Sequence, residues 1–509
     1  MGLGRERRRP RFFLLHSLNF AGFSPKVGKL PEKEGITLDS IWTRTARLPS
    51  FPPLSGDIST EAAVIGGGMT GILTACALRQ AGVPAVVLEA GTIASGQTAG
   101  TTAKLTAQHG LRYAWLTEKL GRAAAGQYAL ANLRAAAWVR SLGADCDLRD
   151  CTSYLYTAGA PAPLREELEA GRRLGLELFL TEDTELPFPA TALGLRHQAV
   201  FHPLKLIGAL ARELTIYEHT QVLGVDGATV LTGRGRVRAE WVIFACHFPF
   251  VNVPGWYFVR QRQERSYVLA LEGPPPLRDA YLGLSGDGLS LRSWDRYLLL
   301  GGAGHPTGEN QKGGQYARLR QAAARLWPGC REAAAWSAQD CVPYDGVPYI
   351  GRFSPARPQW LVATGFQKWG MTSAAVAAQL LTGIVTDQEL PDGDVFAPHR
   401  FHPAAAGGLL QNVGKAAKGL SRRVIAPGRI SVEQLPRGHG GVVKLDGKKL
   451  GAYRDRNGTL YTVSLRCPHL GCQLEWNPEE RTWDCPCHGS RFTFRGERIS
   501  GPAQRDAER

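Results

Sequence analysis

Cysteine and histidine side chains near the C-terminal end of the chain form two short boxes that could hold a metal. Residues 467–472 read Cys-Pro-His-Leu-Gly-Cys, and after twelve more residues 485–490 read Cys-Pro-Cys-His-Gly-Ser. Thiolates and imidazoles bind both zinc and iron–sulfur clusters, and Cys and His at two-residue spacing suit tetrahedral zinc. The residue types alone therefore predict a metal centre, which could be either zinc or an iron–sulfur cluster.

The two boxes resemble those of Rieske iron–sulfur proteins, since Leu-Gly follows the first histidine and Gly-Ser follows the second, features that zinc does not require. In such proteins two thiolates hold one iron of a [2Fe–2S] cluster and two imidazoles hold the other. The resemblance assigns the metal ligands as Cys467, His469, Cys485 and His488. It also implies a disulfide between Cys472 and Cys487 that braces the two ligand loops.

The second box departs from the high-potential Rieske pattern in one position. Phe492 stands where those members have a tyrosine whose hydroxyl donates a hydrogen bond to a ligand sulfur, so we expect a lower reduction potential. Ser490 still offers one such donor. Residues 501–503 resemble the loop that shields the cluster, and because the sequence ends six residues later, we expect the usual closing strand to be short or missing.

A second constellation lies near the other end of the chain. An apolar strand at 62–65 runs into a Gly-x-Gly-x-x-Gly turn and an apolar helix at 72–81, and a strand at 85–88 ends in an acid. The glycines allow a tight turn, close approach of a pyrophosphate and close packing of helix on strand, while the acid can bind a ribose hydroxyl. We therefore expect dinucleotide binding by Gly66, Gly68, Met69, Thr70, Gly71 and Glu89.

The segments around this motif favour FAD over NAD. A small Gly- and Thr-rich stretch at 94–104 follows the acid, and a late strand at 360–363 leads into Thr-Gly-Phe-Gln-Lys-Trp-Gly-Met-Thr at 364–372 and an apolar helix. Together these resemble the D-amino-acid oxidase and glycine oxidase superfamily over roughly residues 41 to 390. The resemblance implies further FAD contacts from Thr98, Val222, Gly365, Gly370, Met371 and Thr372.

The resemblance also implies the fold. We expect an α/β (α+β) Rossmann-like FAD-binding domain with an antiparallel substrate-domain sheet, followed by an all-β Rieske sandwich. We divide the chain into a disordered extension (1–36), an FAD-dependent oxidoreductase (37–400), a linker (401–427) and a Rieske domain (428–509).

One position departs from the glycine oxidase pattern and bears on the substrate. An arginine that binds the substrate carboxylate normally stands five residues before the Asp-Gly pair at 345–346, and here that residue is Asp340. A carboxylate repels an amino acid's carboxylate and attracts a cationic amine. We therefore expect an amine or amino-acid-like substrate, with a helix cap or surface ion pair as the other explanation for Asp340. Arg265 and Lys368 are further candidates for the catalytic face.

Bulk composition limits the partners. The 509 residues carry a net charge of +15, but no basic helix with interleaved aromatics predicts nucleic-acid binding, and no apolar run is long enough to span a membrane. Six scattered cysteines favour a reducing compartment, so we expect a cytoplasmic protein; the basic residues 7–11 leave twin-arginine export as a minor alternative.

The whole chain resembles a bacterial fusion of an amine-oxidase-like flavoprotein with a Rieske domain. Such a protein would take two electrons from a C–N bond onto FAD and pass them singly through the cluster to an external one-electron carrier. Two alternatives remain: the cluster is an electron inlet for a flavin-dependent reduction, or the protein is a redox sensor. The sequence does not decide the oligomeric state.

Overall fold

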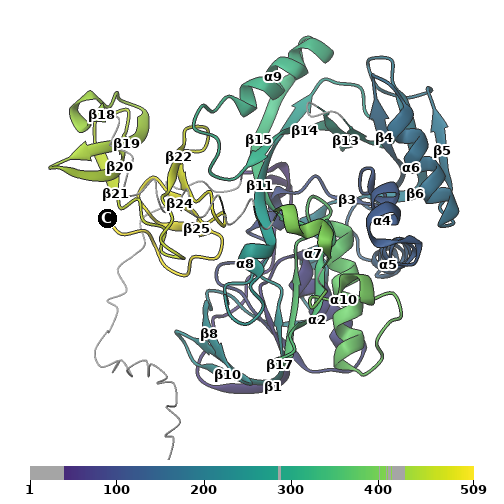
Figure 1. Ribbon diagram of the computed structural model, residues 1–509, viewed down its shortest axis with the longest axis horizontal. Helices are drawn as coiled ribbons and strands as arrows, with labels where there is room; N and C mark the ends of the chain where they lie inside the picture. Colours follow the sequence, from purple (N-terminus) through teal and green to yellow (C-terminus); the bar gives the residue numbers. More distant parts are fainter. Residues whose placement is uncertain (1–38, 285–287, 401, 409, 411–413, 415–429) are drawn as a thin grey trace, which may run out of the picture. The chain divides into compact units, whose positions relative to one another are not determined.

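The computed structural model describes residues 39–284, 288–400, 402–408, 410, 414 and 430–509 (Figure 1). Residues 39–509 belong to one compact unit. The expected N-terminal extension and export signal, and most of the expected linker, lie outside the described residues.

A largely parallel sheet forms the core of the first domain. Its strand order is β16-β17-β10-β1-β2-β7, and every neighbouring pair from β17 to β7 is parallel. The strands are β1 (Ile58–Ile65), β2 (Ala85–Leu88), β7 (Thr215–Tyr217), β10 (Arg236–Phe244), β16 (Tyr349–Ser354) and β17 (Arg357–Thr364), with β8 (Val222–Asp226) and β9 (Thr229–Thr232) attached to β10. The central strand β1 is buried from Ala62 to Ile65, because parallel strands are covered on both faces.

Helices cover this sheet and the region beside it. The two that pack against each other over the sheet are α2 (Met69–Gln80) and α10 (Gly370–Val385), whose Ala-rich surfaces allow close contact. The remaining helices are α1 (Ile41–Thr45), α3 (Gln97–Gly100), α4 (Arg112–Leu120), α5 (Arg122–Ser141), α6 (Ala162–Arg173), α7 (Pro203–Ala211), α8 (Tyr257–Arg260) and α9 (Gln315–Leu326), with 3-10 turns η1 (Asp394–Phe396), η2 (Pro403–Ala405) and η3 (Val432–Gln434).

The second sheet is mostly antiparallel, as the sequence predicts, with one parallel pair between β12 and β4. Its order is β15-β11-β14-β13-β12-β4-β6-β3, with β5 paired to β6. The strands are β3 (Lys104–Leu105), β4 (Arg149–Thr157), β5 (Leu178–Thr181), β6 (Thr191–Val200), β11 (Gln261–Glu272), β12 (Ala280–Gly283), β13 (Ser290–Trp294), β14 (Tyr297–Pro306) and β15 (Arg331–Pro343).

The edge pair β11 and β15 has two different faces. Glu264 lies opposite Asp340, and Arg265 lies opposite Gln339. Because successive side chains of a strand point to opposite faces, and directly opposed residues share a face, Glu264 and Asp340 lie on one side and Arg265 and Gln339 on the other. The two strands therefore form a single layer, here called the wall, with these two residue pairs on its opposite faces.

The C-terminal part is all-β, in two four-stranded sheets. The first contains β18 (Ile430–Ser431), β19 (His439–Leu445), β20 (Lys448–Arg454) and β21 (Leu460–Val463); the second contains β22 (Glu475–Asn477), β23 (Thr482–Asp484), β24 (Arg491–Thr493) and β25 (Arg498–Ser500). Among the described residues no strand follows β25. The tail instead runs back over the domain, where Ala507 is buried and Ser464 donates its amide hydrogen to the carbonyl of Glu508.

Candidate functional site

The glycine turn after β1 has no space for side chains. A Cβ on Gly66, whose φ is +111°, would lie 2.7 Å from the carbonyl oxygen of Ala245. A Cβ on Gly71 would lie 1.8 Å from the carbonyl oxygen of Gly66. The turn and α2 therefore approach as closely as a pyrophosphate cradle at a helix N-terminus requires.

Glu89, at the end of β2, faces this turn. Its two carboxylate oxygens accept hydrogen bonds from the backbone amides of Gly67 and Gly91, at 2.7 and 2.8 Å. Burial raises the pKa of Glu89, and these backbone amides act against the shift. Since each carboxylate oxygen accepts more than one hydrogen bond, capacity remains for ribose hydroxyls.

The other expected FAD contacts surround the same turn. The hydroxyl of Thr98 accepts a hydrogen bond from the amide of Met69 at 2.9 Å, at the start of α2. Val222 packs in one apolar cluster with Ile65 and Leu88, the last residues of β1 and β2. The structure thus brings these sequence-predicted residues together, and their roles toward FAD stay a prediction.

The late glycine-containing turn returns to the early part of the chain. Thr372, at the start of α10, exchanges two hydrogen bonds with the backbone of Thr106, at 3.0 and 2.9 Å. His109 stacks on Trp369 with ring centroids 4.6 Å apart. Segment 364–372, with Gly365, Gly370 and Met371, therefore meets the segment after β3. Neither Thr106 nor His109 belongs to a motif that the sequence analysis identified.

Asp340 and Lys368 lie close enough for their charges to interact. Burial raises the pKa of Asp340 to about 7; the charge of Lys368 opposes this shift, and that of Glu264 adds to it. The Nζ atom of Lys368 lies beside Gly304 of β14, since a Cβ there would be 3.3 Å from it. Two carboxylates and one exposed amine thus share the face of β11, β14 and β15 that carries Asp340. Glu264 is already paired with Arg262.

The structure places the third catalytic candidate elsewhere. The Arg265 side chain is 2% exposed and lies on the opposite face of the wall, where its Nη2 atom is 2.5 Å from a carboxylate oxygen of Glu480. Glu480 belongs to the C-terminal part of the chain. Arg265 therefore does not lie beside Asp340, because adjacent strand positions point to opposite faces.

The four candidate cluster ligands come together in two pairs. The thiols of Cys467 and Cys485 are neighbours, and the rings of His469 and His488 have centroids 4.9 Å apart. Backbone bonds from Gly471 to Cys467 and from Gly489 to Cys485, each 2.9 Å, form the two ligand turns.

The residues fit a Rieske cluster. The Nδ1 atom of His469 is buried without a hydrogen-bond partner, as expected of an atom reserved for a metal. Two thiols and two imidazoles, paired by type, match a cluster with one sulfur-held and one nitrogen-held iron better than a single zinc ion.

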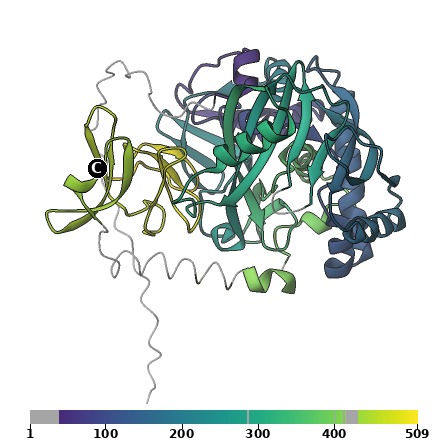
Figure 2. The same cartoon turned by 90° about the horizontal axis from the view of Figure 1, so that it is seen from above.

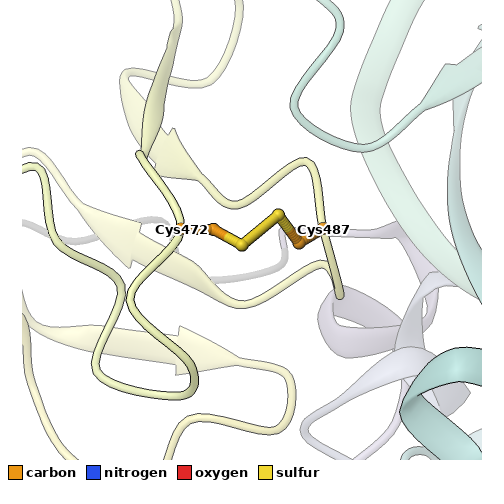
Figure 3. Close-up of a disulfide and its surroundings, with 2 residues drawn as sticks. All are labelled: Cys472 and Cys487. Carbon is orange, nitrogen blue, oxygen red and sulfur yellow. A yellow bond between two sulfur atoms is a disulfide. The ribbon is translucent and has the colours of Figure 1, made fainter. Parts of the chain in front are cut away.

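The two other cysteines of the boxes form the disulfide that the resemblance implied (Figure 3). Cys472 and Cys487 join the two ligand loops across a sequence separation of 15 residues. Ser490 contacts the Cys467 thiol, and its hydroxyl accepts a hydrogen bond from the amide of Ala503 at 3.1 Å. Since Ala503 is fully buried, segment 501–503 lies against the second box, where the sequence predicted a shielding loop.

Two residues of the flavoprotein part complete the surroundings of the histidine pair. Asn252 Oδ1 lies 2.7 Å from His469 Nε2, and Phe258 presents its ring edge-on to both His469 and His488. Neither residue belongs to a recognisable motif. Because the contact joins residues 217 positions apart in sequence, only the folded chain brings them together.

Comparisons with known proteins match two segments of the chain to family models. The family model described as FAD dependent oxidoreductase matches residues 61–384, and the model described as Rieske [2Fe-2S] domain matches residues 429–508. A Bacillus subtilis (strain 168) protein, YhfW, named as a Rieske 2Fe-2S iron-sulfur protein, is 37% identical over 489 residues, covering 91% of this chain and 96% of its own length.

Solved structures resemble the first part of the chain in fold. Glycine oxidase from Geobacillus kaustophilus superposes with a TM-score of 0.56 and 20% identity, over 67% of this chain and 99% of its own. L-amino acid deaminase from Proteus vulgaris gives 0.56 and 15%, over 69% and 100%. L-proline dehydrogenase from P. horikoshii gives 0.57 and 16%, over 69% and 98%.

Proposed function

Because the chain belongs to the FAD dependent oxidoreductase family and carries a C-terminal Rieske [2Fe-2S] domain, we propose that it oxidises a C–N bond of an amine or amino-acid-like substrate and passes the electrons through the cluster to an external carrier. It is an enzyme of the amine and amino-acid oxidase type that binds FAD and a [2Fe–2S] cluster. When bound, FAD takes up two electrons from the substrate and the cluster carries one at a time. We place the functional boundary between the two parts in the segment 401–427.

A short bonded route between the two parts carries this proposal. The side-chain amide of Gln339 donates to the carbonyl of Gly489, next to the candidate ligand His488, at 2.9 Å. Two residues further along β15, the carbonyl of Cys341 accepts from the amide of Gln367 at 2.8 Å. Gln367 belongs to the turn that we assign to the flavin. The route contains two hydrogen bonds and one short stretch of backbone, which supports electron exchange inside one chain.

The substrate face supports an amine. We propose that Asp340, when ionised, attracts an ammonium group, and that Lys368 limits how much negative charge the site holds. Glu264 contributes little free charge because Arg262 neutralises it. The substrate's oxidation to an imine releases two electrons and two protons, so two turnovers of a one-electron carrier balance each substrate molecule.

Anaerobic mixing of the holoenzyme with a panel of amines and amino acids tests this function. We expect bleaching of the flavin absorbance, followed by the EPR signal of a reduced Rieske cluster. Bleaching only after an external reductant first reduces the cluster would replace the outlet with an inlet. Neither change with any compound in the panel would favour a redox sensor.

A further inference from the structure

The strongest unexplained feature outside the catalytic face is a set of buried charges between the two parts of the chain. One carboxylate oxygen of Glu480 receives hydrogen bonds from Arg265 and from the Ser337 hydroxyl, each at 2.5 Å. The other oxygen forms an ion pair with Arg491 at 3.1 Å and accepts a hydrogen bond from Asn477 at 3.2 Å. Burial alone would raise the pKa of Glu480, but the two arginines outweigh it and hold the pKa well below its usual range.

The same loop makes a second, separate contact. Residues 477–480, here called the docking loop, comprise the last residue of β22 and the first three residues of its connection to β23. Glu479 accepts hydrogen bonds from the backbone amides of Gly314 and Tyr316, at 2.5 and 3.2 Å, where α9 begins. A carboxylate is favoured at a helix N-terminus, because free amides and the helix dipole both attract negative charge. The docking loop therefore engages both β11 and α9.

The second ligand box, residues 485–490, is also in close contact with the flavoprotein part. A Cβ on Gly308 would lie 2.6 Å from the Cα atom of Pro486, inside the box. Gln339 and Gly489 are bonded beside it. In two views the C-terminal strands, drawn in yellow, lie against the teal strands of the second sheet, in agreement with these contacts (Figures 1 and 2).

A buried ion pair adds little net stability, because desolvation offsets most of the attraction. It does penalise every other arrangement, since a shifted domain would bury one charge without its partner. Glu480 and Arg265 are 5% and 2% exposed, so this penalty applies almost fully here. The pair therefore specifies one position of the Rieske domain on the wall formed by β11 and β15.

We propose that the docking loop and Arg265 are positioning elements that hold the cluster at one fixed place on the flavoprotein sheet, so that electron exchange with the flavin needs no movement of the Rieske domain. The electron-exchange half of this inference rests on the proposed function, whereas the fixed docking does not. Arg265 thus acts through Glu480 and lies on the face opposite Asp340.

Because Glu480 has more partners than Arg265, we expect Arg265→Met and Glu480→Met to weaken docking to different extents. In Arg265→Met, Glu480 keeps Arg491, Ser337 and Asn477. In Glu480→Met, Arg265 keeps only its short hydrogen bond to Ser337 and becomes a buried charge without a counter-ion. The double variant, Arg265→Met with Glu480→Met, removes both charges, and replacing a buried pair by apolar side chains of similar volume is often neutral.

Two readouts on the holoprotein test the proposal. Hydrogen exchange of the amides of Gly314 and Tyr316, which donate to Glu479, reports docking without any substrate. The rate of cluster reduction after photoreduction of the flavin with EDTA reports electron exchange, also without a substrate. Exposed Arg296, which pairs with Glu272 far along β11, supplies the control variant Arg296→Met.

For Glu480→Met we expect amide hydrogen exchange about tenfold faster and cluster reduction about tenfold slower than in the parent. For Arg265→Met we expect both rates to change by about threefold or less. For the double variant we expect both rates to lie within about twofold of the parent. Arg296→Met should match the parent. A double variant as impaired as Glu480→Met would overturn the ion-pair argument. Faster exchange with unchanged cluster reduction would overturn the positioning role while leaving the docking intact. If Glu480→Met loses its cluster, Glu480→Gln with iron and flavin content checked gives the same comparison.

Discussion

His469 Nε2 of the Rieske domain lies 2.7 Å from Oδ1 of Asn252 of the flavoprotein part. Because Nδ1 of the same ring is buried and reserved for the metal, Nε2 carries the hydrogen and Asn252 accepts it. An acceptor on the outer nitrogen makes a ligating imidazole more electron-rich. The flavoprotein part therefore takes part in setting the electronic properties of the cluster.

Replacing Asn252 by Leu should raise the reduction potential of the cluster. Loss of the acceptor makes His469 a poorer electron donor, which disfavours the oxidised cluster; a hydrogen bond of about 1 kcal/mol corresponds to a shift of at most about 40 mV for one electron. An EPR-monitored redox titration measures it. Gln221→Met, which removes a contact with Gln504 away from the ligands, should leave the potential unchanged. A lower potential in Asn252→Leu would contradict the assignment of donor and acceptor.

Replacing Gly71 by Ala should abolish FAD retention. The added Cβ would meet the carbonyl oxygen of Gly66 at 1.8 Å, so the backbone of the turn must move, at a cost of about 3 kcal/mol. Flavin released on denaturation and urea unfolding measure the two effects. Gly126→Ala is the matched control, because Gly126 lies within α5 with no atom within 4 Å of its Cβ position, and it should be neutral or slightly stabilising.

The activity toward cationic amines should rise with pH through about 7. Burial raises the pKa of Asp340 to about 7, with Lys368 opposing and Glu264 adding to the shift, so the carboxylate that attracts an ammonium forms only as the pH passes this value. kcat/KM should therefore increase between about pH 6 and 8, while simple amines remain protonated. In Asp340→Asn this rise should disappear. A profile with the same rise in the variant would assign it to another group.

The same group predicts a pH dependence of stability. Since the folded-state pKa of Asp340 lies above the value of 3.8 for an unperturbed aspartate, the folded chain binds one more proton than the unfolded chain between about pH 4 and 7. The contribution of Asp340 to the free energy of unfolding is therefore largest at low pH and falls as the pH rises to 7. Urea unfolding at several pH values should show this fall in the parent relative to Asp340→Asn.

Removing the disulfide should loosen the cluster site. Cys472→Ser releases a loop of about 15 residues from its cross-link, which corresponds to about 3 kcal/mol in the chain-entropy model. We expect lower iron content and a lower midpoint in urea. Cys330→Ser, a free and half-buried cysteine outside the Rieske domain, should change neither. Full cluster retention in Cys472→Ser would show that the ligand turns hold their shape without the bond.

The local motifs were predictable from the sequence because they depend on neighbours in the chain. The strand at 85–88 is β2 as predicted, and the helix predicted at 72–81 begins three residues earlier, at Met69, because the glycine turn leads directly into it. The pairing of Cys472 with Cys487, implied by the resemblance, is confirmed. In each case the signal lies within a few residues of the feature.

The contacts between the two parts were not predictable in the same way. Asn252, Phe258 and Glu480 lie in segments without a motif, and their partners in the other part of the chain are 143 or more positions away in sequence. Arg265 illustrates the consequence. The sequence made it a candidate for the catalytic face, but the two-residue period of a strand turns its side chain to the side opposite Glu264 and Asp340.

The wall of β11 and β15 also bears on how such proteins can diverge. Positions 264 and 340 lie on the face that we propose for the substrate, whereas 265 and 339 contact the Rieske domain. Substitutions at one set leave the other untouched, so a lineage could acquire a new substrate without redesigning its electron outlet. Among relatives with different substrates, variation should concentrate on alternate positions of these two strands.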